Sequence, residues 1–120
     1  MVTVLVIDDT ETDRQLAAQV VKGLGYQVLF AGDGVEGVGK AKDIKPDLIL
    51  LDVVMPKQDG FATCRELKKD ADTKDIPVVL TTSKGTDTDK FWGQRQGASA
   101  YVVKPYGPAE LRDVLTNLVK

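Results

Sequence analysis

The sequence predicts one α/β domain with a five-stranded parallel sheet that helices cover on both faces. Its length of 120 residues suits a single domain. Five short apolar runs alternate with stretches whose apolar residues repeat at helical spacing. The runs lack the polar alternation of a strand with one wet face, so each strand is expected to be buried on both sides. Strands that alternate with helices in this way form βαβ units and hence a parallel sheet.

The predicted strands are the runs rich in Val, Ile and Leu. They cover residues 2–7, 26–30, 48–51, 78–80 and 101–103. The second run ends in Phe30-Ala31 and offers no polar group, as expected of an edge strand in the order 2-1-3-4-5.

Helical stretches fill the intervals, each with an apolar stripe. Gly25 is expected to end the first helix, and Pro108 suits the first turn of the last one. The fourth helix is expected to run from Asp87 to Gly97 and to bury part of two adjacent aromatic residues, although one helix face cannot bury both fully. The stripes of the first, third, fourth and fifth helices are Leu16, Val20 and Leu24; Phe61, Cys64 and Leu67; Phe91 and Trp92; and Leu111, Val114, Leu115 and Leu118.

The second helix has the weakest pattern of the five. Val35, Val38 and Lys42 mark its face, but Gly37 and Gly39 lie inside it. Each glycine is expected to cost the helix ~1 kcal/mol relative to Ala.

Composition excludes several classes of function. The chain has no histidine, which rules out Ser–His–Asp and Cys–His catalysis, zinc sites that need histidine, and a phosphohistidine carrier. The formal net charge of −2 gives no basic excess for nucleic acid. Cys64 is the one cysteine, so no intramolecular disulfide is expected. No apolar stretch approaches the ~20 residues of a membrane span. A cytoplasmic protein that binds neither nucleic acid nor membrane is predicted.

Polar side chains follow four of the five predicted strands. Asp8 and Asp9 follow the first, Asp52 the third, Thr82 the fourth and Lys104 the fifth. Ligands of open α/β sheets bind at the carboxyl ends of the strands, where the strand order reverses. These side chains are therefore expected to face one crevice.

This set of groups indicates phosphoryl transfer. Three carboxylates at ~5 Å would repel by ~3 kcal/mol per pair at an effective dielectric constant of about 20, so the cluster needs a cation or protonation. Oxygen ligands favour a hard ion, and a shallow site with few carboxylates suits Mg²⁺. Lys104 can meet an anion and Thr82 can donate a hydrogen bond to it. A carboxylate can itself be the nucleophile in such a site.

The same residues resemble the receiver domain of two-component response regulators, which has the flavodoxin-like (βα)5 doubly wound fold. The resemblance spans essentially all 120 residues. Residues 89–98 look more particularly like single-domain receivers of chemosensory systems that control type IV pili and twitching motility. The matching motifs are Asp8-Asp9, Leu50-Leu51-Asp52, Met55-Pro56, Asp59-Gly60, Thr82-Ser83 and Lys104-Pro105, with Tyr101 three residues before the lysine.

The resemblance implies a metal site and a phosphate acceptor. Asp52 would be the acceptor, and Asp9 would bind Mg²⁺ directly. Asp8 would assist through water, and the backbone carbonyl of Val54 would complete the protein ligands. Val54 and Lys84 lie two positions after Asp52 and Thr82, where receivers vary and where the lifetime of the phosphoryl group is set. Val54 offers no side-chain amide to place an attacking water, so slow hydrolysis of the phosphoryl group is predicted.

The resemblance also implies a switch. Lys104 would pair with the phosphoryl group, Thr82 would turn toward it, and Tyr101 would change between outward and inward rotamers. The peptide bond between Lys104 and Pro105 is expected to be cis. The altered surface would be the face formed by the fourth helix, fifth strand and fifth helix.

The implied function is a signalling protein rather than an enzyme. A sensor histidine kinase would donate the phosphoryl group, and a downstream protein would bind the altered face. Residues 1–120 are expected to form the whole receiver, with no output domain, as a monomer or a weak phosphorylation-dependent dimer.

Other interpretations of the same residues stay open. An Asp pair at a strand end can cap the next helix, Thr82 can be an ordinary strand residue, and Tyr101 a packed aromatic. A receiver-like interaction module that takes no phosphate, or a phosphate sink for a shared kinase, would also fit. A flavin carrier of the same fold is rejected, because four acidic residues would repel the FMN phosphate: Asp8, Asp9, Glu11 and Asp13.

Overall fold

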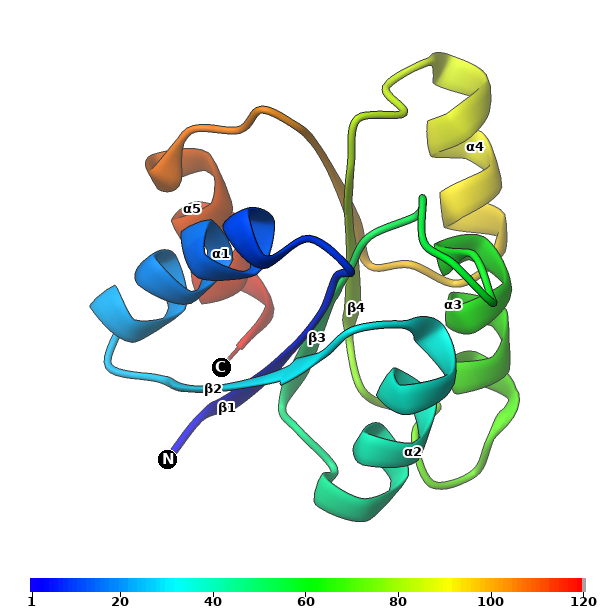
Figure 1. Cartoon of the computed structure of the whole chain (residues 1–120), viewed down its shortest axis with the longest axis horizontal. Coiled ribbons are helices and arrows are strands. Elements are labelled where there is room, and N and C mark those ends of the chain that lie inside the picture. Colours follow the sequence, from blue (N-terminus) through cyan, green and yellow to red (C-terminus); the bar gives the residue numbers. More distant parts are fainter. Residues whose placement is uncertain (120) are drawn as a thin grey trace.

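The computed structural model describes residues 1–119 as five strands and five helices in strict alternation (Figure 1). In chain order these are β1 (Thr3–Ile7), α1 (Glu11–Gly23), β2 (Gln27–Ala31), α2 (Gly34–Ile44), β3 (Leu48–Leu51), α3 (Gly60–Lys69), β4 (Val78–Thr82), α4 (Asp87–Arg95), β5 (Ala100–Val103) and α5 (Pro108–Leu118).

The strands form one parallel sheet in the order β2-β1-β3-β4-β5, which confirms the predicted flavodoxin-like fold. In register, Val4 of β1 lies between Val28 of β2 and Leu48 of β3. β2 is an edge strand, as predicted. The strand order reverses at β1, so the carboxyl ends of β1 and β3 flank the point where ligands bind in such sheets.

Helices cover both faces of the sheet (Figure 1). α1 and α5 pack on one face, and α2, α3 and α4 lie on the other. Alternate residues of β1 enter opposite cores: Leu5 and Ile7 pack with the α2 and α3 side, and Val4 and Val6 with the α1 and α5 side. The unbroken apolar runs of the sequence are explained by this burial on both faces.

The stripe predicted for α1 is confirmed at Val20 and Leu24, which are partly buried against the core, but is wrong at Leu16, which is 51% exposed. The buried residues of the helix are Ala17, Ala18 and Val21. The physical reason is that small alanine side chains let α1 approach the sheet closely. Gly25 has φ of 81°, a left-handed conformation that suits glycine and that ends the helix as predicted.

The face predicted for α2 is confirmed at Val38 but not at Val35. Val35 is 60% exposed, whereas Val38 and Ala41 are buried. Gly37 is also buried, and a Cβ at this position would collide with the side chain of Ile7. This glycine therefore serves close packing of α2 on the sheet, a role that its helix propensity does not indicate.

α4 starts at Asp87 as predicted, behind a capping box made by Thr86 and Asp89. It ends at Arg95, two residues before Gly97. α4 buries its aromatic pair only in part, as expected, because Phe91 is 54% and Trp92 50% exposed. The buried residue of α4 is Gly93, where a side chain would collide with Leu80 and Tyr101.

The stripes of α3 and α5 are confirmed in their central residues. Cys64 and Leu67 of α3 and Leu111 and Leu115 of α5 are fully buried. Pro108 occupies the first turn of α5, where its missing N–H has no helical partner to lose.

Candidate functional site

Three carboxylates meet where β1 and β3 end. Asp8 and Asp9 directly follow β1, and Asp52 directly follows β3. Each offers one oxygen within 4.8 Å of those of the other two. Asp8 and Asp52 are buried and Asp9 is exposed, so the cluster opens to solvent at one side. The predicted convergence of these three residues is observed.

Asp52 is held by the backbone around it. Its N–H donates to the carbonyl of Ile7 at 3.0 Å, and its Oδ1 accepts from the N–H of Val53 at 2.8 Å. Burial raises the pKa of the Asp52 carboxyl, and the negative charge of Asp8 acts in the same direction. The positive charge of Lys104 and the backbone N–H groups of Val53 and Val54 oppose this rise in the pKa.

Gly60 lies against the backbone of Asp52. A Cβ at Gly60 would overlap the carbonyl oxygen of Asp52, and the N–H of Gly60 donates to the carbonyl of Val53 at 2.8 Å. The Asp59-Gly60 motif therefore has two structural functions here: Asp59 caps α3 by accepting from the N–H of Ala62, and Gly60 lets α3 start close to the backbone of Asp52.

Lys104 follows β5 and places its ammonium among carboxylates. Its Nζ lies 2.8 Å from Oδ2 of Asp8, 2.9 Å from Oδ2 of Asp13 and 3.6 Å from Oδ2 of Asp52. Burial lowers the pKa of Lys104, but the hydrogen bonds to Asp8 and Asp13 outweigh it, so the net shift of the pKa is upward. Lys104 is therefore a firmly charged group. Its peptide bond to Pro105 is cis, as expected.

Asp13 is the residue of this site that sequence reasoning missed. It lies in the first turn of α1, where an acidic residue is ordinarily explained by the helix dipole. The signal that could have found it is its spacing from Ala17 and Val21. These residues follow Asp13 at intervals of four and face the sheet, so Asp13 is on the same side of α1.

Thr82 and Tyr101 meet at the backbone of Lys84. Thr82 lies at the end of β4 rather than after it, and its buried hydroxyl accepts from the N–H of Lys84 at 3.3 Å. The hydroxyl of Tyr101 donates to the carbonyl of Lys84 at 2.5 Å, and burial raises the pKa of this phenol to about 12. One residue of the loop after β4 is therefore bound from both sides.

The donor set suits a hard cation. The three aspartates supply only oxygen, and Lys104 is the cation that already lies among them. Such a set could bind a metal ion, with a preference for Mg²⁺ over ions that favour nitrogen or sulfur. Val54, the fourth ligand implied by sequence, lies two residues after Asp52 and is 53% exposed.

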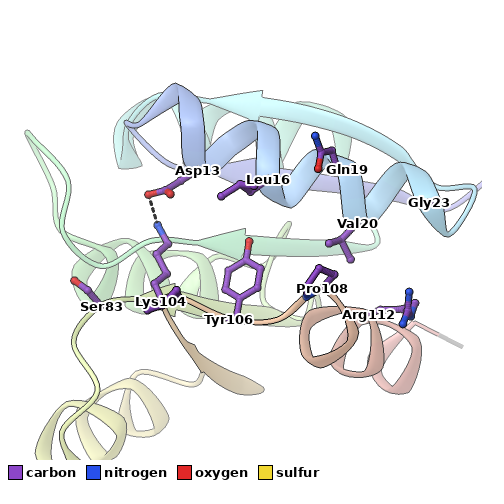
Figure 2. Close-up of a pocket in the computed structure, with 11 residues that line it drawn as sticks. Asp13, Leu16, Gln19, Val20, Gly23, Ser83, Lys104, Tyr106, Pro108 and Arg112 are labelled. Atoms are coloured by element: carbon purple, nitrogen blue, oxygen red, sulfur yellow. Dashed lines mark hydrogen bonds and ion pairs between the residues drawn. The ribbon is translucent and has the colours of Figure 1, made fainter.

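A groove borders the site on the α1 side. It has a volume of about 570 Å³ and runs between α1, the segment after β5 and the start of α5 (Figure 2). Leu16 and Val20 line one wall, and Tyr106 and Pro108 line the other. Asp13 and Lys104 close the end nearest the carboxylates and point toward each other.

Over residues 1–119, no helix has the length and apolar character that crossing a membrane would require.

The fold and the acidic cluster together define an α/β signalling domain of the two-component class, and sequence comparison agrees. Residues 4–116 match the response regulator receiver domain. The chain therefore belongs to this family.

Among its relatives is protein PilH of Pseudomonas aeruginosa, 45% identical over 105 residues, which are 88% of this chain and 87% of PilH. The transcriptional regulator RpaA of Synechocystis is 40% identical, over 92% of this chain but 46% of RpaA. The structure of the chemotaxis protein CheY4 of Vibrio cholerae superposes with a TM-score of 0.92 at 31% identity, covering 98% of both chains.

Proposed function

We propose that this chain accepts a phosphoryl group on Asp52 from a sensor histidine kinase, in a reaction that depends on Mg²⁺, and that the phosphorylated form changes its protein contacts. The observation that carries the proposal is the position of Asp52 at the end of β3, with Asp8, Asp9 and Lys104 gathered around it.

The chemistry follows from this arrangement. An oxygen of Asp52 attacks the phosphorus of a phosphohistidine, the new O–P bond forms and the N–P bond breaks. The electron pair of the broken bond returns to the imidazole of the donor. A bound Mg²⁺, held by Asp8, Asp9 and Asp52, would supply positive charge to the transferring oxygens.

Lys104 and Thr82 would hold the product. Phosphorylation places a dianion where a monoanion was, and a lysine and a hydroxyl at this edge can contact it only in that state. Because Thr82 and Tyr101 share the backbone of Lys84, a turn of Thr82 toward the phosphoryl group would disturb the hydrogen bond that holds Tyr101. This link supports Tyr101 as the output side of the switch.

The relatives suggest where this switch operates. The likeness to PilH and to the chemotaxis protein CheY4 supports a role in chemosensory or pilus control. Membership of the receiver family is consistent with the cytoplasm as the place where the chain acts. The exposed Phe91 and Trp92 support the α4-β5-α5 face as the surface that a downstream protein binds. The chain would act as a phosphoryl acceptor rather than as a turnover enzyme.

Phosphorylation with a small-molecule donor tests the proposal. Acetyl phosphate with Mg²⁺ is expected to add one phosphoryl group to the wild-type chain, measured by intact mass. Asp52→Asn should abolish the added mass, and so should removal of Mg²⁺ by a chelator. Asp43→Asn, which removes an exposed acid of α2, is the matched control and should be labelled like the wild type. Labelling of Asp52→Asn at the wild-type level would contradict the assignment.

A further inference from the structure

Lys104 is hydrogen-bonded to carboxylates other than that of Asp52, beside which it would contact a phosphoryl group. Its Nζ is within hydrogen-bond distance of Asp8 and Asp13, at 2.8 and 2.9 Å, but lies 3.6 Å from the nearest oxygen of Asp52. The ammonium is therefore drawn to the α1 side of the crevice and away from the residue that would carry phosphate.

Asp13 differs from the other carboxylates in its position. Asp8 and Asp52 follow strands of the sheet, whereas Asp13 belongs to α1 and lies outside the group of three acids that can hold a metal. Its carboxylate points at Lys104 across the end of the groove (Figure 2). The Asp13 side chain is 33% and the Lys104 side chain 16% exposed, so water screens this ion pair only in part.

We propose that Asp13 is a positioning residue that holds Lys104 in the unphosphorylated arrangement and opposes its transfer to the phosphoryl group on Asp52. This inference rests on the proposed function of Asp52. Phosphoryl oxygens on Asp52 would compete with the Asp13 carboxylate for the N–H donors of Nζ, two of which already serve Asp8 and Asp13. The phosphorylated state therefore gains less stabilisation from Lys104 than it would from a lysine with no other partner. The balance between the unphosphorylated and phosphorylated arrangements is set in part by α1.

The inference predicts that loss of the ion pair between Asp13 and Lys104 raises the affinity of the chain for a phosphoryl mimic. Beryllofluoride, a non-covalent mimic of the phosphoryl group, should bind Asp13→Asn about fivefold more tightly than the wild type, which equals about 1 kcal/mol. Asp13→Ala should show the same gain, because it also removes the charge. Asp13→Glu keeps a carboxylate that can reach Lys104 and should restore the wild-type affinity.

The measurement is a beryllofluoride titration followed by fluorine NMR, with Mg²⁺ saturating for every variant so that changes in metal affinity do not enter. Glu11→Gln is the matched control, because it removes another acidic charge from the first turn of α1, at an exposed residue. Its affinity should stay within about twofold of the wild type, since its charge is screened by solvent. Melting curves of all variants confirm that each is folded.

The outcomes separate this inference from the proposed function. A wild-type chain that fails to bind beryllofluoride would overturn both. Wild-type binding that disappears in Asp52→Asn, with unchanged or weaker binding in Asp13→Asn and Asp13→Ala, would overturn the role of Asp13 alone. Weaker binding would show in addition that Asp13 orients Lys104 productively. An equal gain in Glu11→Gln would also overturn it, because the effect would then come from net charge and not from the ion pair.

Discussion

Cys64 carries a thiol that is enclosed in the core of the molecule. It is fully buried in the core beside α3, and its Sγ lies 3.5 Å from the carbonyl oxygen of Gln96. Burial raises the pKa of the thiol from 9.0 to about 11, whereas Lys68 acts weakly in the opposite direction. The thiolate is the reactive form, so burial and the raised pKa make Cys64 an unreactive residue of the core.

We therefore expect Cys64 to resist alkylation in the folded chain. At about pH 8 the raised pKa reduces the thiolate fraction about a hundredfold relative to a thiol of ordinary pKa, and burial slows access further. Iodoacetamide labelling followed by mass spectrometry should be complete in denaturant and very slow without it. Because the pKa of the Cys64 thiol is higher in the folded chain than in the unfolded chain, the thiol also affects stability. Its contribution is present below the pKa of the unfolded chain and is lost as the pH rises toward the pKa of the folded chain. Rapid labelling of the native chain would contradict this burial.

The limits of sequence reasoning are visible at Asp13 and Leu16. Asp8, Asp9, Asp52 and Lys104 could be placed together from sequence because all four follow strands, and parallel strands end at one edge. The contribution of a helix residue depends on how the helix is rotated about its axis. The larger apolar side chains of α1 suggested a face through Leu16, but close packing selects its alanines, and the same rotation carries Asp13 over the strand ends.

At the scale of elements, α2 carries two interior glycines, Gly37 and Gly39, in different environments. A Cβ at Gly37 would collide with Ile7, whereas a Cβ at Gly39 would meet nothing within 4 Å. Helix propensity alone treats the two positions alike. The sequence therefore predicted the presence of a weak helix, but only the packing of α2 on β1 shows why one of its glycines is needed.

Alanine substitution separates the two glycines. Gly39→Ala should raise the free energy of unfolding by about 0.5–1 kcal/mol, because alanine favours the helix and has space. Gly37→Ala should lower it by about 1–3 kcal/mol, since the added methyl forces α2 away from the sheet. Urea denaturation of both variants measures the difference. A stabilised Gly37→Ala would show that Ile7 can adapt and that α2 does not pack as described.

At the scale of the molecule, the strand order determines where acidic side chains can gather. β1 and β3 are neighbours in the middle of the sheet, and their ends place Asp8, Asp9 and Asp52 together although the third is more than forty residues away in the chain. The alternation of apolar runs and helical stripes predicted the parallel sheet, whereas the strand order was taken in part from the known flavodoxin-like fold. A charge cluster formed only on folding would link the stability of the whole domain to any cation that it binds.

Mg²⁺ should therefore stabilise the folded chain. A cation that binds the folded form alone adds RT ln(1 + [L]/Kd), about 1.4 kcal/mol at ten times Kd, which corresponds to an increase in Tm of about 5 °C. Asp9→Asn should retain the fold, because Asp9 is exposed, but should lose most of this increase. Melting curves with MgCl₂, and with NaCl at the same ionic strength as the control for screening, measure the effect. If Asp9→Asn gained as much stability from Mg²⁺ as the wild type, the ion would have to bind elsewhere, and the acidic cluster would be left with Lys104 as its only counter-charge among the described residues.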